Sequence, residues 1–318
     1  MNDLISIIVT SYNHAEYLKQ RLDTLLDQTY KNKEIIIVDD FSTDSSRDIL
    51  NKYKDFPCIK LVFLSKNMGY AYACNYGVSL SRGEFIMFAE CDDYNEPAHL
   101  EKLYENIIGS EDTGVAYSRS NIVDNTGKII GDDFHGSFKA FKRFCSKDIL
   151  IPRNKMQKFL ITSCVIPNMS ASLIRKKYFN AVNGLSESFK VCADWDFWCR
   201  MAQVCDFYYV TSPLNNFRRH QTTVREISGL EAQFSEIFEL LQNALSGINL
   251  TRTEKLKFKI NLGYIFAHEA LFGYRKGLKS FSHVLMYGFK FEKFFFLLGL
   301  IRSSFDLFCY KLRKICIN

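Results

Sequence analysis

The segment Phe85–Asp93, which reads FIMFAECDD, decides the fold class of this chain. It is an apolar run of strand length that follows a turn signal at 81–83 and ends in three carboxylates within four residues. A short apolar run of this kind is typical of a strand buried in a parallel sheet. Because open α/β sheets bind ligands at the carboxyl ends of their strands, the segment predicts a ligand site at that edge.

The carboxylates Glu90, Asp92 and Asp93 favour a divalent cation at this site. Carboxylates that crowd together repel one another, and apolar surroundings disfavour their charged forms. Mg²⁺ or Mn²⁺ would relieve both costs, since hard cations prefer oxygen ligands and share them with substrate phosphates. On this segment alone, an acidic loop that merely ends a strand is an equally good interpretation.

Strand and helix signals alternate over the first hundred residues, which is typical of a parallel sheet with crossover helices. We expect strands at 5–10, 34–38, 59–64 and 85–90, and helices at 16–27, from capping residues 42–44 to about 53, and at 72–80. Further on we expect a strand at 115–118, a hairpin turn at 124–127, an irregular acceptor-facing segment at 121–167, a strand at 170–174 and a helix at 193–202. The prediction is an α/β catalytic domain at 1–225 followed by a helical region at 226–318.

The composition excludes several classes of protein. With 318 residues, 47% hydrophobic and 24% charged, the chain has an ordinary globular composition. Its ten cysteines form no CxxC pair, which argues against a zinc site or a disulfide scaffold and favours free thiols. The first strand is followed by no GxGxxG, and the chain has no P-loop motif and no GxSxG. The N-terminus lacks a basic signal-peptide region, so we expect a cytoplasmic protein.

A series of motifs occurs in the order found in one enzyme family. They are SIIVTSYN at 6–13, QTY at 28–30, IIVDDFSTD at 36–44, NMG at 67–69, ACNYG at 73–77, the acidic cluster at 90–93, ADWDFW at 193–198 with Arg200, and FRRH at 217–220. Over residues 4–225 the chain resembles the inverting glycosyltransferases of family 2, which share the GT-A fold. The resemblance implies metal-dependent transfer of a hexose or N-acetylhexosamine from a nucleotide diphosphate sugar, with UDP favoured over GDP or dTDP. The implied acceptor is a glycan hydroxyl, for example on a lipid-linked intermediate of surface polysaccharide or lipopolysaccharide assembly.

The resemblance also assigns roles to individual residues. Asp194 would be the general base that removes a proton from the acceptor hydroxyl, and Asp92 and His220 would bind Mn²⁺ or Mg²⁺, although His220 could equally be a structural hydrogen-bonder. Contacts with the nucleotide and its diphosphate would come from Thr10, Tyr12, Asn13, Asp39, Asp40, Asn67, Gly69, Glu90, Arg218 and Arg219. Trp195 and Trp198 would form a wall of the acceptor site, the alternative being that one or both belong to the core.

Three residues depart from the family pattern. Glu90 stands where the first acid of the DxD pair is usually Asp, Cys74 where Arg is common, and Ala193 where Glu is frequent. These departures support an alternative, a catalytically silent module that binds a sugar nucleotide or a glycan. A nucleotidyltransferase would need a phosphate loop rich in Gly, Arg and Lys near the first strand, and residues 11–14 do not supply one. Because Asp92 and Asp194 are both present, we expect an active transferase.

The stretch 291–318 carries an apolar seam with alternating spacings of three and four, typical of an amphipathic helix. The seam consists of Phe291, Phe294, Leu298, Ile301, Phe305, Phe308, Leu312 and Ile315. Residues 279–318 contain seven Lys or Arg against two acids, and therefore hold most of the net charge of +6. Within 291–318 the longest uncharged run, 294–301, is far below the roughly 20 residues that span a bilayer. A helix lying on the anionic inner face of a membrane fits this pattern, and packing on the catalytic domain or in a homodimer fits it equally well. We expect no nucleic-acid partner, because the basic charge does not extend over the catalytic part.

Overall fold

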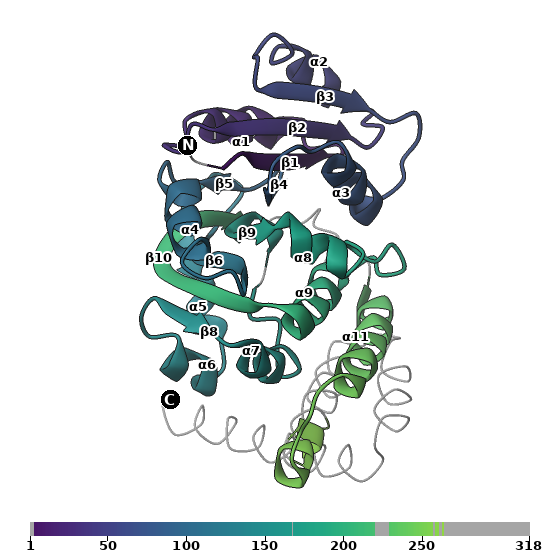
Figure 1. Ribbon diagram of the computed structural model, residues 1–318. Coiled ribbons are helices and arrows are strands. Elements are labelled where there is room, and N and C mark those ends of the chain that lie inside the picture. The colour runs from purple at the N-terminus through teal and green to yellow at the C-terminus, as the bar shows by residue number, and fades with distance from the viewer. Residues whose placement is uncertain (1–2, 167, 220–228, 257, 261–262, 264–318) are drawn as a thin grey trace, which may run out of the picture. The chain divides into compact units, whose positions relative to one another are not determined.

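The computed structural model describes residues 3–166, 168–219, 229–256, 258–260 and 263. The chain forms two compact units, Met1–Thr223 and Val224–Asn318 (Figure 1). The described part of the second unit includes the helix α11 (Gly229–Ser246). The predicted apolar seam at 291–318 lies outside the described residues. Among the helices that the structure describes, none is both long and apolar enough to cross a membrane.

The first half of the sheet consists of four parallel strands joined by helices. The strands are β1 (Ile5–Ser11), β2 (Lys33–Asp39), β3 (Ile59–Phe63) and β4 (Phe85–Glu90), in the spatial order β3-β2-β1-β4. The connecting helices are α1 (Ala15–Leu26), α2 (Ser46–Asn51) and α3 (Tyr70–Ser79). All of β1 from Ile5 to Val9 is buried, which explains why this stretch is apolar apart from Ser6 and does not alternate.

The second half of the sheet mixes strand directions. Beyond β4 lie β9 (Ser172–Arg175), β6 (Thr113–Val123), β10 (Asp206–Arg218) and β5 (Tyr94–Asn95), while β7 (Ile129–Asp132) pairs with β6 and β8 (Ile149–Ile151) pairs with β10. β9 runs antiparallel to both β4 and β6, so the sheet is mostly but not wholly parallel. The helices here are α4 (His99–Ile107), α5 (Asp133–Gly136), α6 (Lys139–Phe144), α7 (Arg153–Leu160), α8 (Lys176–Ala181) and α9 (Ala193–Val204).

The structure corrects three expectations about these elements. The 13-residue strand β10 was not predicted, because Pro213 and shifts of register on both sides of it interrupt the strand pattern. The segment 121–167 is not irregular: it contains the end of β6 and the short elements β7, α5, α6, β8 and α7. β9 begins two residues later than predicted, since residues 169–171 form a 3₁₀ turn.

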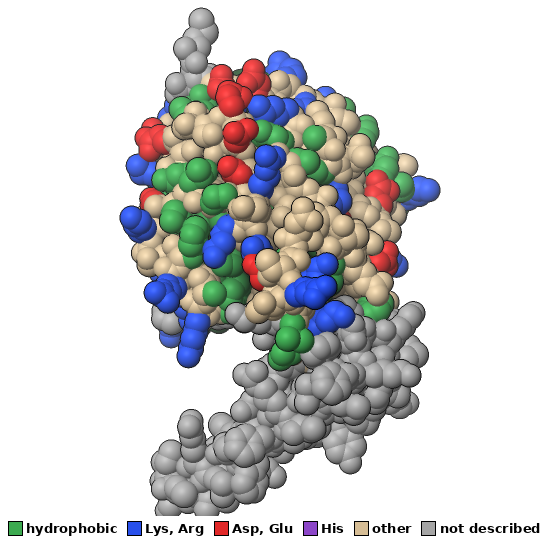
Figure 2. Space-filling model, turned by 60° about the horizontal axis from the view of Figure 1, so that its bottom comes forward, with side chains coloured by type: hydrophobic (Ala, Val, Ile, Leu, Met, Phe, Trp, Pro, Cys, Tyr) green, Lys and Arg blue, Asp and Glu red, His purple; other side chains and the backbone are tan. Residues whose placement is uncertain are grey.

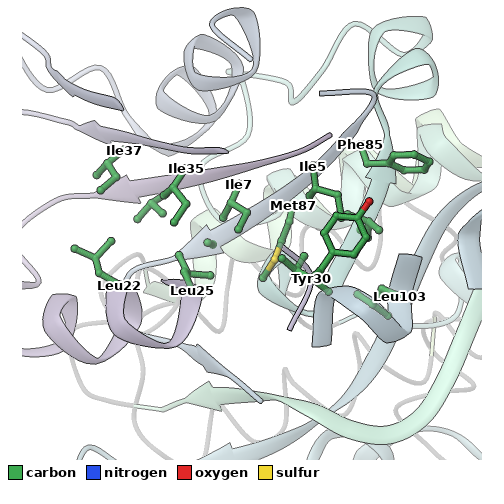
Figure 3. Close-up of a cluster of buried hydrophobic side chains, with 14 of the residues drawn as sticks. Ile5, Ile7, Leu22, Leu25, Tyr30, Ile35, Ile37, Phe85, Met87 and Leu103 are labelled. Atoms are coloured by element: carbon green, nitrogen blue, oxygen red, sulfur yellow. The ribbon is translucent and has the colours of Figure 1, made fainter. Parts of the chain in front are cut away.

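The hydrophobic core fixes the positions of the strand ends. On one face of the sheet, side chains of β1, β2 and β4 pack against α1 and α4, with the labelled residues of Figure 3 all at most 3% exposed. On the opposite face α3 lies close to β1: a Cβ atom at Gly77 would be 2.4 Å from Cγ2 of Ile8. Only glycine fits such a close approach without a shift of helix or strand. The parallel strands are therefore held between two packed layers.

The surface carries charges of both signs. On the face shown in Figure 2, Lys and Arg side chains of the described residues are interspersed with Asp and Glu side chains. A one-signed basic surface, which nucleic-acid recognition uses, is not what this face presents.

Candidate active site

The carboxyl ends of β1, β2 and β4 gather predicted donor-binding residues at one edge of the sheet. Ser11 of β1 is paired with Asp39 of β2, and Thr10 of β1 is paired with Glu90 of β4. In open α/β sheets the crevice at this edge is the usual ligand site. The structure thus places Thr10, Asp39 and Glu90 together, while their contacts with a nucleotide stay a prediction.

The acidic loop, residues 90–93, concentrates negative charge directly after β4. Burial raises the pKa of Glu90 well above its usual range, and the charges of Asp93, Asp92 and Asp194 raise it further. Burial, followed by repulsion from Asp92, raises the pKa of Asp93 to about 7. Hydrogen bonds hold the loop: among them, the backbone N–H of Glu90 donates to Oγ of Ser170 (3.0 Å), and that of Arg218 donates to Oδ1 of Asp93 (3.0 Å).

The acidic loop has the chemistry to take a hard cation. Oδ2 of Asp93 is buried and has no hydrogen-bond partner in the part of the chain that the structure describes. A divalent cation would relieve the repulsion that raises the pKa of both Glu90 and Asp93. No group of three or more His, Cys, Asp or Glu side chains among the described residues is arranged to hold a metal ion alone. In proteins Mg²⁺ is usually held by one or two carboxylates together with substrate phosphates.

Asp194, the predicted base, comes from a different part of the chain than the acidic loop. It is the second residue of α9, where the positive end of the helix dipole stabilises a carboxylate. Its Oδ1 accepts a hydrogen bond from the backbone N–H of Trp195 (2.7 Å). The charge of Asp194 contributes to the raised pKa of Glu90, at the end of β4, and of Tyr70, at the start of α3. Asp194 and the acidic loop are therefore coupled electrostatically.

The nearby Asp196 is engaged elsewhere. It is 6% exposed and pairs with Nε and Nη2 of Arg200 at 2.8 and 2.7 Å. Arg200 in turn donates from Nη1 to the carbonyls of Val182 (2.6 Å) and Gly184 (2.7 Å). Asp196 thus secures α9 to the preceding turn, which makes Asp194 the better candidate for a base.

Arg218 does not have the role that we predicted. It is 2% exposed, and its guanidinium donates hydrogen bonds of 2.7–2.9 Å to O of Asp92, O of Asp124, O of Asn125 and Oε1 of Gln20. Its guanidinium also lies over the ring of Tyr17, 4.6 Å from the centroid. A buried guanidinium with these partners holds the acidic loop against β10 and α1 rather than contacting a diphosphate. The neighbouring Arg219 is exposed and stays a candidate, and His220 lies outside the described residues.

Asp39, the residue predicted to bind the nucleobase, is fully buried. It pairs with Arg47, whose guanidinium lies near the rings of Phe41 and Phe63. Its Oδ1 accepts hydrogen bonds from the backbone N–H of Ser42 (3.1 Å) and Nε of Arg47 (2.8 Å), and its Oδ2 has no partner among the described residues. Arg47 also lies 5.4 Å from the ring centroids of both Phe41 and Phe63. Phe41 has a φ of 68°, which is rare for a bulky residue and is tolerated where the surroundings hold it. A nucleobase would reach Oδ2 only after a neighbouring side chain moves, because Asp39 is 0% exposed.

Asp40, which is buried, and Asn13, which is exposed, both accept hydrogen bonds from backbone groups of the loops at this edge. The carboxylate of Asp40 accepts hydrogen bonds from the backbone N–H groups of Met68 (2.6 Å) and Gly69 (2.8 Å). Gly69 has a φ of 92°, which favours glycine there. Oδ1 of Asn13 accepts from the backbone N–H of Thr43 (2.8 Å). The two remaining predicted contacts, Tyr12 and Asn67, are exposed at the same loops.

The two tryptophans of α9 differ, and one prediction about them is wrong. Trp198 is 0% exposed and packs between Phe197 and Phe207, with ring centroids 5.0 and 6.5 Å away. A residue at this depth belongs to the core and cannot stack on an acceptor sugar. Trp195 is partly exposed and donates from Nε1 to the carbonyl of Leu160 (2.8 Å), so it stays a candidate for the acceptor wall.

Arg21 is a residue of this site that the sequence reasoning missed. It is 0% exposed in α1, donates from Nη1 to Oδ1 of Asn95, and interacts electrostatically with the acidic loop. A signal was present, because Arg21 stands three residues after Leu18 and four before Leu25, on the apolar face of the helix. A charged residue on such a face indicates a buried partner of opposite charge.

A further carboxyl with a raised pKa lies in the predicted acceptor-facing segment. Burial raises the pKa of Asp133 from 3.8 to about 7, although the backbone N–H of Ser120 donates to its Oδ2 (3.0 Å). Because the pKa is higher in the folded protein than in the unfolded chain, the contribution of this carboxyl to stability falls as the pH rises from 3.8 to about 7.

We expect Asp133→Asn to raise stability above pH 7 and to have little effect near pH 4. The amide keeps an oxygen for Ser120 and carries no charge, so the gain is bounded by about 1.4 kcal/mol per unit of the pKa difference. Thermal unfolding of both proteins between about pH 5 and pH 8 tests this. A melting-temperature difference that does not change with pH would contradict it.

The chain is similar in sequence to known glycosyltransferases. A sequence profile described as "Glycosyl transferase family 2" matches residues 6–181, more than half of the chain. The chain is also 29% identical over 287 residues to an uncharacterised glycosyltransferase of Rickettsia typhi, covering 89% of this chain and 84% of that protein.

Two solved structures have a similar fold. Residues 1–349 of S. aureus TarS, in complex with UDP-GlcNAc, align with a TM-score of 0.63 and 19% identity over 81% of this chain and 70% of that one. The mannosyltransferase PcManGT from Pyrobaculum calidifontis, in complex with GDP-Man and Mn²⁺, aligns with a TM-score of 0.58 and 13% identity over 95% and 87%. At these identities the likeness shows the fold, which is the GT-A type of mixed sheet flanked by helices.

Proposed function

The chain belongs to glycosyltransferase family 2, and from that premise we propose that it is a metal-dependent inverting enzyme that uses a UDP-linked sugar. The sugar would be a hexose or an N-acetylhexosamine, and the acceptor a glycan hydroxyl. The TarS structure contains UDP-GlcNAc, which supports a UDP-linked donor here by analogy of fold.

One observation supports this proposal: the charge of Asp194, on α9, acts on Glu90, at the end of β4. The charges of Asp92 and Asp93 act on Glu90 as well. Sugar transfer needs a group that anchors the diphosphate and, on the opposite side of the anomeric carbon, a base for the acceptor. The acidic loop and Asp194 are suited to these two tasks.

In the proposed reaction Asp194 accepts the proton of the acceptor hydroxyl as its oxygen attacks the anomeric carbon. The new bond forms between that oxygen and the anomeric carbon, and the bond to the diphosphate oxygen breaks. Attack opposite the leaving group inverts the configuration, and the electron pair leaves with the nucleoside diphosphate. Asp194 begins α9, and the helix N-terminus stabilises its charged form before the reaction.

The acidic loop would supply the side chains for the cation. Asp92 would hold Mn²⁺ or Mg²⁺ together with the diphosphate, and Glu90 would reach the ribose or a metal-bound water. The cation, when bound, offsets the negative charge that grows on the leaving diphosphate. Arg218 keeps the loop in place through its hydrogen bond to the carbonyl of Asp92 (2.8 Å).

The acceptor side of the proposal rests on the family resemblance. We propose a glycan hydroxyl on a lipid-linked intermediate of surface polysaccharide assembly, with Trp195 beside the acceptor. Contact of residues 291–318 with the inner face of a membrane, or with a second subunit, stays a prediction from their sequence pattern, because they lie outside the described residues.

We expect UDP and UDP-sugars to raise the melting temperature of the protein in the presence of Mn²⁺ and much less in EDTA. A ligand at 100 times its dissociation constant stabilises the folded state by about 2.7 kcal/mol, which such a scan detects. GDP and dTDP, with their sugars, provide the comparison for the base. Equal shifts in Mn²⁺ and EDTA would contradict metal dependence, and larger shifts with GDP would contradict the choice of donor.

A further inference from the structure

The two carboxylate oxygens of Asp39 are in different states. Oδ1 accepts hydrogen bonds from the backbone N–H of Ser42 (3.1 Å) and from Nε of Arg47 (2.8 Å). Oδ2 is buried and has no hydrogen-bond partner in the part of the chain that the structure describes. Because a buried oxygen without a partner is costly, a ligand that donates one hydrogen bond to Oδ2 would be stabilised there.

A second polar group without a partner lies beside Asp39. Ser11, the last residue of β1, is the register partner of Asp39 in β2, and register partners in neighbouring strands point to the same face of the sheet. Ser11 is 1% exposed, and its Oγ has no hydrogen-bond partner among the described residues. A hydroxyl next to a single carboxylate oxygen suits a ligand that carries one N–H beside a carbonyl group.

Arg47 is held from several sides, which keeps Oδ1 of Asp39 occupied. Its Nη2 donates to the carbonyl of Leu64 (3.1 Å), and its guanidinium lies 5.4 Å from the ring centroids of both Phe41 and Phe63. A guanidinium within about 6 Å of a ring centroid is attracted to the ring. A ligand would therefore take Oδ1 from Arg47 only at the loss of these contacts.

The nucleobases differ in the number of N–H groups that they present to a carboxylate. Uracil and thymine present one, the N3–H of the imide, with a carbonyl on each side. Guanine presents two, N1–H and the exocyclic amino group, which match both oxygens of one carboxylate, and cytosine has no hydrogen on N3. A carboxylate with one oxygen already occupied suits an imide base and leaves the amino group of guanine without an acceptor.

We propose that Arg47 is a positioning residue that determines the choice of nucleobase. By occupying Oδ1 of Asp39 it leaves a single acceptor oxygen, and so favours uracil or thymine over guanine. The N3–H of the base would donate to Oδ2, and the hydroxyl of Ser11 would donate to an adjacent carbonyl of the base. Because Asp39 is 0% exposed, entry of the base requires a neighbouring side chain to move. The inference rests on the proposed function for the use of a nucleotide-linked sugar, but it does not depend on sugar transfer.

The test compares GDP with inosine diphosphate, whose bases differ only in the exocyclic amino group. Affinities for UDP and for these two nucleotides are measured by titration in Mn²⁺. For the wild type we expect UDP to bind most tightly, and GDP to bind no more tightly than inosine diphosphate, because its amino group finds no acceptor. Arg47→Met makes Oδ1 available, so the ratio of GDP to inosine diphosphate affinity should rise about tenfold, the effect of one hydrogen bond to a charged group.

Arg82 provides a matched control, because it pairs with a carboxylate near the opposite end of β2. Its Nε donates to Oε2 of Glu34 (2.9 Å), and its side chain is exposed. Arg82→Met removes the same charge and a similar ion pair. It should leave the ratio of GDP to inosine diphosphate affinity at the wild-type value.

The outcomes separate this inference from the proposed function. If Arg47→Met has the same ratio as the wild type and Arg82→Met, or binds neither purine nucleotide, Arg47 does not select the base and the inference is wrong. A preference of the wild type for UDP would then still support the proposed donor. If the wild type binds UDP without releasing it from any UDP-sugar, the proposed transferase is wrong, while a raised ratio in Arg47→Met still supports the inference.

A further ligand decides the matter if Arg47→Met does not fold. In 3-methyl-UDP a methyl group replaces the N3–H, so the wild type should bind it far more weakly than UDP. That loss, together with no gain from the amino group of GDP, supports the inference. Tighter binding of GDP than of inosine diphosphate by the wild type would show that both oxygens of Asp39 accept, and would overturn it. A wild type that binds none of these nucleotides would contradict both the inference and the proposed function.

Discussion

Asp194→Asn will abolish most sugar transfer while leaving binding of UDP and Mn²⁺ nearly intact. The amide keeps the shape of the side chain and an oxygen for the backbone N–H of Trp195, which donates to Oδ1 at 2.7 Å. It cannot accept the proton of the acceptor hydroxyl. General-base catalysis contributes about 10²–10⁴-fold to rate, so we expect a loss of that size in kcat. Initial rates with saturating donor, together with UDP titrations, measure both parts of this prediction.

Asp196→Asn is the matched control for this substitution. It changes the same atoms two residues further along α9, but Asp196 is paired with Arg200 at 2.8 Å and is 6% exposed. We expect it to lower thermal stability more than Asp194→Asn does and to reduce kcat less. If Asp194→Asn keeps more than about a tenth of the wild-type rate, Asp194 is not the general base.

Asp92→Ala will remove the metal-dependent part of nucleotide binding. Without the bridging cation, the diphosphate of UDP would face the charges of Glu90 and Asp93 directly. Titration with UDP in Mn²⁺ should therefore show a much weaker affinity, whereas the affinity for UDP in EDTA should stay the same or improve. Removing one partner of a buried charge pair typically costs about 2–5 kcal/mol, so we expect a loss of about two orders of magnitude in affinity, which is about 2.7 kcal/mol.

Asp48→Ala controls for the loss of one negative charge. Asp48 is exposed in the first turn of α2, outside the acidic loop. The Asp48→Ala variant should bind UDP in Mn²⁺ with the same affinity as the wild type. An unchanged affinity of Asp92→Ala in Mn²⁺ would refute the assignment of Asp92 to the metal.

The parallel half of the fold could be predicted because its strands are short, mostly apolar segments between turn signals, although β1 contains Ser6 and β3 contains Lys60. The runs in β1 and β4 are buried on both faces, so nothing in them suggests an alternative structure. The same pattern did not predict β10, because Pro213 and the shifts of register around it interrupt the strand signal. The position of β10 is set by its pairing with β6 and β8. Long-range pairing decides such a strand, and a local pattern does not contain that information.

The positions of the site residues at strand ends and helix starts could be predicted better than the groups that their side chains contact. The sequence places Asp39 and Glu90 at strand ends and Asp194 at a helix start, and the structure has them there. The sequence does not reveal that the guanidinium of Arg218 donates its hydrogen bonds to backbone carbonyl groups, because those acceptors lie about a hundred residues or more away in the chain. Trp198 illustrates the same limit: its spacing from Trp195 fits a shared acceptor wall, but packing against Phe207 places it in the core.

The most direct measurement is nucleotide release from sugar nucleotides by the purified protein, with Mn²⁺ or EDTA and with glycan or water as the acceptor. We expect the wild type to release UDP from at least one UDP-sugar in Mn²⁺, and to release far less in EDTA. Asp194→Asn should release almost none while still binding UDP. If the wild type binds UDP-, GDP- or dTDP-sugars but releases nucleotide from none of them, the protein is a silent binding module and the proposed catalytic site is wrong.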